Sequence, residues 1–174
     1  MTKKIIVLSG KQYSGKDTVA KILLEKLTGF RRVGIGDAIK LEYSKRTGLS
    51  VEEIEKNKAN YRPDLITLGN EGRAISDTYW LSALLQIEGN LIIPDIRLKK
   101  EYAFFEAQNA FKIRVNSTYE NRSKRGTVVK DDDLTETDLD NITSWDYVIE
   151  NNSTYEDLVQ NSAKLIETIK TQLL

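Results

Sequence analysis

The chain has 174 residues, 40% hydrophobic and 30% charged, as in an ordinary globular protein large enough to bury a core. Lysine plus arginine and aspartate plus glutamate each number 26, so the zero net charge gives no support to non-specific nucleic-acid binding. The lack of cysteine and histidine excludes disulfides, thiolate nucleophiles, zinc sites built from these residues and Ser-His-Asp triads. With neither a signal peptide nor a long apolar run, we expect one cytoplasmic domain over residues 1–174 that does not enter a membrane.

The N-terminal stretch carries the strongest motif. An apolar run at 5–8 precedes a loop bracketed by Gly10 and Gly15, and a helical pattern follows Lys16, which matches the G-x-x-x-x-G-K core of a P-loop. Glycines let successive backbone N–H groups face one anion, and the helix start adds a positive dipole end. We therefore expect ATP to be held by Gly10, Lys11, Ser14, Gly15, Lys16, Asp17 and Thr18.

The residue after Lys16 departs from the general P-loop pattern. A Ser or Thr hydroxyl normally ligates Mg²⁺ there, whereas this chain has Asp17 and then Thr18. A carboxylate is also a hard oxygen ligand, so Asp17 is a metal candidate, directly or through water, and Thr18 is another. The other interpretation, a glycine-rich turn in an ordinary βα unit, is disfavoured by the strand and the helix on either side.

Four further apolar runs predict strands buried on both faces, as in a parallel sheet. They are 91–93, 113–115, 147–149 and, more weakly, 30–35. Helical stretches between them predict a three-layer α/β/α fold with about five parallel strands. Asp95 ends the run at 91–93 in the manner of a Walker B strand, whose carboxylate reaches Mg²⁺, and Arg97 would lie at the same sheet edge.

Polar residues between the second and third strands are acceptor-site candidates. Asp37, read as the N-cap of a helix, and Lys40 would face the acceptor beside the P-loop. Arg62 and Arg73 flank a helical stretch that Pro63 would begin, although solvated arginines are the commoner case.

A basic segment follows the fourth strand. Arg122, Lys124 and Arg125, ended by Gly126, predict either a solvated charge run or a lid over residues 118–138 whose arginines close on the transferred phosphoryl group. The acidic stretch 131–133 would pair with those arginines or stay solvated.

Ser9 to Thr18 resembles the S-G-K-x-x-S-G-K-D loop of two groups of P-loop kinases: phage-type deoxynucleoside monophosphate kinases and animal-type phosphomevalonate kinases. The stretch from Arg62 to Arg73, with Trp80 after it, is similar to the nucleotide kinases. The lid from 121 to 126 and the stretch from 132 to 151 are similar to the phosphomevalonate kinases. The resemblance implies a nucleoside monophosphate kinase-like fold and phosphoryl transfer from ATP to the phosphate of a small monophosphate.

The acceptor is less well defined. Phosphomevalonate kinases have Arg-Lys where this chain has Gln12-Tyr13, and a second arginine where it has Leu98. We therefore expect a (deoxy)nucleoside monophosphate, with mevalonate 5-phosphate as the alternative and a non-catalytic nucleotide-binding or switch module as the rival from another class. Trp80, although typical of a core residue, joins the substrate-binding candidates in this interpretation.

The expected mechanism rests on positioning and charge neutralisation, since an acceptor phosphate with a second pKa near ~6 is already ionised at neutral pH. The protein would work as a monomer or homodimer with Mg²⁺, ATP and a small monophosphate, without nucleic acid. The expected catalytic residues are Lys16, Arg97, Arg122 and Arg125; the metal residues are Asp17, Thr18 and Asp95; the substrate residues are Asp37, Lys40, Arg62, Arg73, Trp80 and Arg97.

Overall fold

The computed structural model describes residues 3–174, and their contacts divide into two compact units. The sheet unit comprises residues 3–32 and Gly89–Leu174, and the helical unit comprises Val33–Glu88. The expectation of a single domain over the whole chain stays a prediction.

The sheet unit contains five parallel strands in the order β2-β3-β1-β4-β5, which confirms the predicted parallel α/β fold. Their bounds are β1 Ile5–Ser9, β2 Phe30–Arg32, β3 Asn90–Ile93, β4 Phe111–Asn116 and β5 Tyr147–Glu150. The central strand β1 is paired on both sides, with Ile6 opposite Ile92 in β3 and Phe111 in β4. All five of its residues are buried, which explains why its sequence is an apolar run rather than an alternating one.

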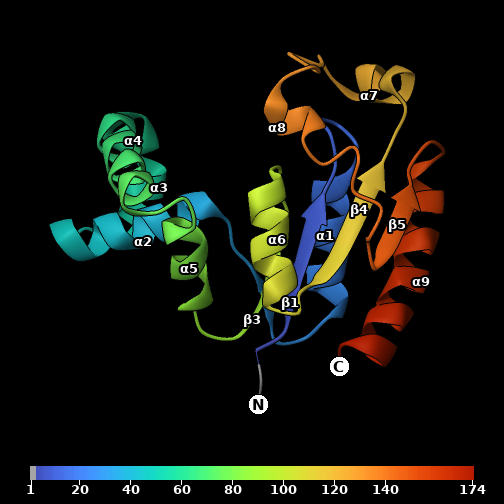
Figure 1. Ribbon diagram of the computed structural model, residues 1–174, viewed down its shortest axis with the longest axis horizontal. Helices are drawn as coiled ribbons and strands as arrows, with labels where there is room; N and C mark the ends of the chain where they lie inside the picture. The colour runs from blue at the N-terminus through green and yellow to red at the C-terminus, as the bar shows by residue number, and fades with distance from the viewer. Residues whose placement is uncertain (1–2) are drawn as a thin grey trace. The chain divides into compact units, whose positions relative to one another are not determined.

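Helices cover both faces of this sheet (Figure 1). The helices α1 Lys16–Lys26 and α9 Tyr155–Gln172 pack on one face, where Leu23, Leu165 and Ile169 are fully buried against the strands. The helix α6 Lys99–Ala107 lies on the opposite face and buries Phe105 completely. Thr154 caps α9, with Asp157 in the reciprocal position of a capping box.

The predicted lid segment contains two short helices, α7 Tyr119–Arg125 and α8 Leu134–Thr137, between β4 and β5. Both lie beyond the carboxyl ends of the strands (Figure 1). The loop from β1 to α1 leaves the sheet at the same end. Ligands of open α/β sheets bind at this end, so the fold places the P-loop and the basic segment where phosphate chemistry is expected.

The helical unit contains α2 Ile35–Thr47, α3 Val51–Lys56, α4 Lys58–Ile75 and α5 Tyr79–Leu85. The predicted strand 30–35 was too long, because Gly34 already caps α2. Asp37 is therefore not the N-cap: it lies in the first turn of α2, and its carboxylate accepts from the Gly34 N–H at 2.8 Å. Pro63 lies inside α4 rather than at its start, since the helix begins at Lys58.

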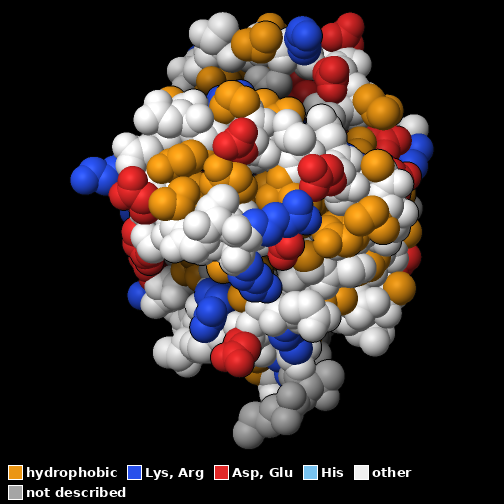
Figure 2. Space-filling model, turned by 90° about the vertical axis from the view of Figure 1, so that its left-hand side faces the viewer, with side chains coloured by type: hydrophobic (Ala, Val, Ile, Leu, Met, Phe, Trp, Pro, Cys, Tyr) orange, Lys and Arg blue, Asp and Glu red, His pale blue; other side chains and the backbone are white. Residues whose placement is uncertain are grey.

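Charged side chains of both signs are interspersed on the face that Figure 2 presents, consistent with the zero net charge. Among residues 3–174, no helix is both long enough and apolar enough to cross a membrane.

Candidate functional site

The P-loop has the backbone that its glycines allow. Gly15 has a φ of 100°, in the left-handed region, and a Cβ there would lie 2.3 Å from Asn151 Nδ2. A Cβ on Gly10 would lie 2.5 Å from the Val115 carbonyl oxygen. The loop closes on itself through the Ser14 N–H, which donates to the Lys11 carbonyl at 3.0 Å.

A cavity of about 410 Å³ opens over this loop, lined by Gln12, Tyr13, Gly15, Lys16, Asp17, Thr18 and Arg125. Four of the seven predicted ATP-binding residues therefore share one cavity with a lid arginine. Ser14, within the loop, is fully buried. The Lys11 side chain forms an ion pair with Asp140 at 2.8 Å. Lys11 is thus paired with a carboxylate and does not line this cavity.

Two metal candidates, Asp17 and Asp95, lie close to the Lys16 ammonium group. The Lys16 side chain is 7% exposed, and its Nζ lies 3.5 Å from Asp95 Oδ1 and 3.9 Å from Asp17 Oδ2. Asp17 and Asp95 are themselves accessible, so their oxygens suit a hard cation. Residues 3–174 contain no cluster of three acidic residues that would hold a metal unaided. This set fits Mg²⁺ held mainly by ATP phosphates, with Asp95 and either Asp17 or Thr18 contributing.

Arg97 is held by two carboxylates at the edge of the P-loop. Its Nε donates to Asp95 Oδ2 at 3.0 Å, and its Nη1 donates to Glu136 Oε1. Burial lowers the pKa of Arg97, but the hydrogen bonds and charges of Asp95 and Glu136 outweigh it, and the net direction is upward. The guanidinium is therefore a fixed cation that shares the Asp95 carboxylate with Lys16.

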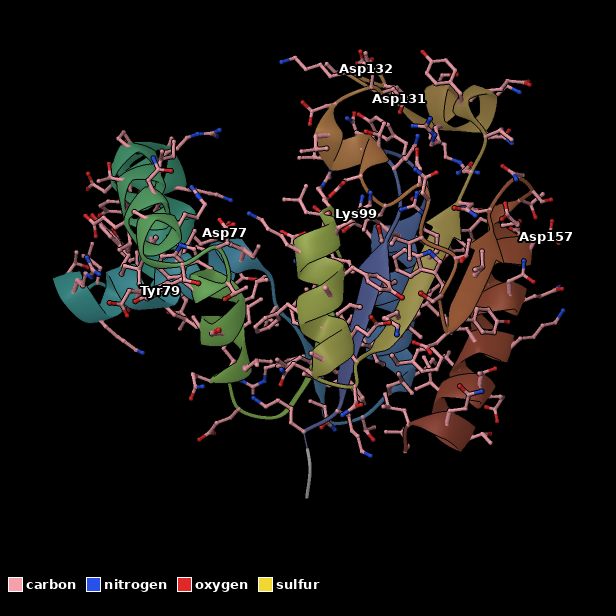
Figure 3. The ribbon with its side chains drawn as sticks, in the orientation of Figure 1. Asp77, Tyr79, Lys99, Asp131, Asp132 and Asp157 are labelled. Atoms are coloured by element: carbon pink, nitrogen blue, oxygen red, sulfur yellow. The ribbon has the colours of Figure 1, made fainter. Side chains whose placement is uncertain are left out.

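The lid arginines both reach the P-loop backbone, from α7. Arg122 is 3% exposed and pairs with both oxygens of Asp131, at 2.7 and 2.8 Å, while its Nη1 faces the Gln12 carbonyl at 3.4 Å. The hydrogen bond from Arg122 lowers the pKa of Asp131. Asp131 and Asp132 lie in the loop between α7 and α8 (Figure 3), so one of the two predicted outcomes, pairing with a lid arginine, holds for Asp131.

Arg125 takes a different position from Arg122. It lines the cavity and donates to three oxygens: the Tyr13 carbonyl at 3.2 Å, Ser117 Oγ at 3.1 Å and the Asn151 carbonyl at 2.8 Å. None of these partners carries a charge. Arg125 is thus a lid cation without a carboxylate partner among residues 3–174, and it lines the cavity over the P-loop.

Sequence reasoning missed three residues that shape this site. Asn151 donates from Nδ2 to the Ser14 carbonyl at 2.8 Å and so supports the P-loop from the end of β5. Asp140 pairs with Lys11 and also with Arg114, both at 2.8 Å. Glu136 accepts from the Gln12 N–H at 2.8 Å. The available signal was the resemblance of the stretch 132–151 to the phosphomevalonate kinases, which the sequence alone did not connect to the P-loop.

The remaining substrate candidates belong to the helical unit. Lys40 pairs with Asp37 at 2.8 Å and with Glu55 at 2.7 Å. Burial lowers the pKa of Lys40, but these two carboxylates outweigh it, and the net direction is upward. Arg62 is exposed and has no ion pair within residues 3–174, whereas Arg73 donates to Asn70 Oδ1 at 2.8 Å. Their assignment to the acceptor stays a prediction.

Trp80 has a packing role in this structure. It is 3% exposed, its Nε1 donates to the Gly69 carbonyl at 2.9 Å, and its ring lies edge-on to Tyr79, which Figure 3 labels. The indole thereby uses its one polar atom on the backbone of α4. These contacts account for the burial of Trp80, and its assignment to the substrate site stays a prediction.

The contact between Trp80 and α4 leads to a stability prediction. A Cβ at Gly72 would lie 2.5 Å from Trp80 Nε1, whereas a Cβ at Gly36 would meet nothing within 4 Å. We expect Gly72→Ala to lower the free energy of unfolding by about 3 kcal/mol through overpacking. The higher helix propensity of alanine should restore about 1 kcal/mol of it. The melting temperature should fall by roughly 4–8 °C, as measured by calorimetry. Gly36→Ala is the matched control and should leave it unchanged or higher; equal effects of the two variants would contradict this packing.

Comparison with known proteins supports these assignments at the level of family and fold. The family model described as phosphomevalonate kinase matches residues 8–111. Phosphomevalonate kinase of Drosophila melanogaster is 29% identical over 182 aligned positions, which cover 94% of this chain and 94% of that protein.

Solved structures agree on the fold. TT1252 from Thermus thermophilus aligns over 100% of both chains, with a TM-score of 0.56 and 17% identity. Shikimate kinase from Acinetobacter baumannii, solved with shikimate, aligns over 99% of this chain and 97% of its own, with a TM-score of 0.55 and 20% identity. The site described above is thus that of a P-loop kinase that phosphorylates a small molecule, and the chain belongs to the phosphomevalonate kinase family.

Proposed function

We propose that this protein transfers the γ-phosphoryl group of ATP to the phosphate of mevalonate 5-phosphate, giving ADP and the 5-diphosphate. The observation that carries the proposal is the match to the phosphomevalonate kinase family over residues 8–111, with a relative of that name aligned along nearly the whole chain. This was the alternative in the sequence interpretation. It now has more support than a nucleoside monophosphate acceptor.

Of the sequence features that had favoured the nucleoside monophosphate, Trp80 and Gln12 have other contacts in the structure. Trp80 is buried, and its indole nitrogen is hydrogen-bonded to the backbone. Gln12 uses its side chain on the lid segment, where Nε2 donates to the Val129 carbonyl at 2.7 Å and Oε1 accepts from the Val129 N–H at 3.2 Å. A glutamine at this position is thus a structural replacement in the loop and says little about the charge of the acceptor.

The residues of the sheet unit suit in-line phosphoryl transfer. An oxygen of the acceptor phosphate, largely ionised at neutral pH, forms the new P–O bond as the bond to ADP breaks, so no strong general base is needed. Lys16 neutralises the outer phosphates, and Arg97 and Arg125 offer guanidinium donors to the transferred group and the acceptor. When Mg²⁺ is bound, it supplies further charge neutralisation on the phosphates.

The test is ADP release from Mg-ATP, measured with mevalonate 5-phosphate, with a panel of ribo- and deoxynucleoside monophosphates, and with no acceptor. We expect strong stimulation by mevalonate 5-phosphate alone. Stimulation by nucleoside monophosphates alone would refute the proposed acceptor and leave a kinase. ATP hydrolysis that no acceptor alters would favour the non-catalytic switch module.

A further inference from the structure

Glu136 is a buried carboxylate that the reaction described above does not use. It lies in α8, within the lid segment, and its side chain is 1% exposed. Its two oxygens have separate partners: Oε2 accepts from the Gln12 N–H at 2.8 Å, and Oε1 accepts from Arg97 Nη1. Burying a charge is costly unless it is paired and hydrogen-bonded, so these two partners account for its presence there.

The contact with Arg97 fixes the direction of a guanidinium. Arg97 donates a hydrogen bond from Nε to Asp95 and another from Nη1 to Glu136, while its Nη2 has no hydrogen-bond partner within residues 3–174. The side chain is 29% exposed. Because the guanidinium is planar and rigid, two fixed donors determine where the third nitrogen points. Arg97 is therefore oriented in advance, with one end left for an anion.

Glu136 also holds the P-loop, through its contact with Gln12. The backbone N–H of Gln12 points to Glu136, and its carbonyl oxygen faces Arg122 Nη1 at 3.4 Å. The side chain of Gln12 pairs with both backbone groups of Val129. One carboxylate thus links the outer part of the P-loop with the arginine that follows β3.

We propose that Glu136 is a positioning residue for phosphoryl transfer: anchored to the P-loop at the Gln12 N–H, it holds Arg97 in the orientation that the transferred group requires. The inference rests on the proposed function for the role of Arg97 towards the acceptor. Glu136 touches neither substrate, and its effect on the rate passes through Arg97.

A double-mutant cycle tests this role, with the kinetic constants for acceptor and for ATP measured in each variant. We expect Glu136→Gln to lower kcat/KM for the acceptor by about 10²-fold, because a loosely held guanidinium is misplaced in the transition state. In an Arg97→Ala background the same change should cost less than about threefold, since the group through which it acts is gone. Glu136→Asp, which keeps the charge, should recover part of the loss.

Asp138→Asn is the matched control. Asp138 is in the same segment, but it accepts from the backbone N–H of Lys99, at the start of α6 (Figure 3), and touches neither Arg97 nor the P-loop. We expect its kinetics to match those of the unaltered protein.

The cycle separates a positioning role from a purely structural one. Equal losses in both backgrounds, or a loss confined to KM for ATP, would overturn the inference. Failure of the unaltered protein to use mevalonate 5-phosphate would refute the proposed function instead, and the cycle would then be run with the nucleoside monophosphate that it accepts.

Discussion

Replacing Lys16 with alanine is expected to lower kcat on the order of 10³-fold, the scale of losing one preorganised charge at a developing anion. Lys16 is the first residue of α1, and its Nζ lies within 4 Å of both Asp17 and Asp95. ATP phosphates would take the place of these carboxylates as its partners. ADP release under saturating ATP and acceptor measures the effect.

The fold should survive this change. Asp95 keeps its pairing with Arg97 at 3.0 Å when Lys16 is shortened, so no buried carboxylate is left without a cation. Lys21→Ala is the matched control, because Lys21 is an exposed lysine on the same helix. We expect both variants to have nearly the same melting temperature and only Lys16→Ala to lose activity. A Lys16→Ala protein with near-normal turnover would refute the P-loop assignment.

The sheet could be predicted because its signals are local. Runs such as Ile5–Leu8 are apolar without alternation, a pattern typical of strands covered on both faces. The P-loop could be predicted because steric limits, both within the loop and from its neighbours, require glycine at these positions. Gly15 shows both limits, with its positive φ and its contact with Asn151.

The long-range pairs could not be predicted from the sequence. Gln12 and Glu136 are 124 positions apart, and Asn151 and Ser14 are 137 apart. Nothing in the local pattern around α8 indicates that Glu136 is buried while Asp133 and Asp138, which flank the helix, are not. A run of basic residues such as 122–125 likewise indicates that the lid is positively charged. It does not identify the partners of each arginine.

Asp37 and Trp80 in the helical unit show a common physical ambiguity of sequence patterns. Asp37 is equally suited to an N-cap and to the third helical position, because its carboxylate can accept a backbone N–H from either. Trp80 has an apolar body and one donor, so the same residue suits a ligand pocket or a helix interface. In both cases a neighbouring backbone group determines the contact that the side chain makes: the Gly34 N–H for Asp37 and the Gly69 carbonyl for Trp80. The sequence does not reveal which backbone group is in reach.

The lid is expected to act through Arg125 more than through Arg122. Arg122 is buried and neutralised by Asp131, whereas Arg125 lines the nucleotide cavity and is bonded only to uncharged oxygens. A cation without a carboxylate partner can turn towards a transferring phosphoryl group without breaking an ion pair. The geometry therefore gives Arg125 the place of an arginine that stabilises transition-state charge.

Arg125→Ala should accordingly lower kcat on the order of 10³-fold, the low end of what such an arginine contributes, with a smaller effect on ATP affinity. Single-turnover kinetics and equilibrium binding of a fluorescent ATP analogue separate the two effects. Lys124→Ala is the matched control, since Lys124 is an exposed neighbour that pairs only with Glu120, at 2.6 Å. If ATP binding were lost with the rate of the chemical step, the bonds from Arg125 to Tyr13 and Asn151 would be part of the resting nucleotide site, and the lid would hold ATP rather than act on the phosphoryl group.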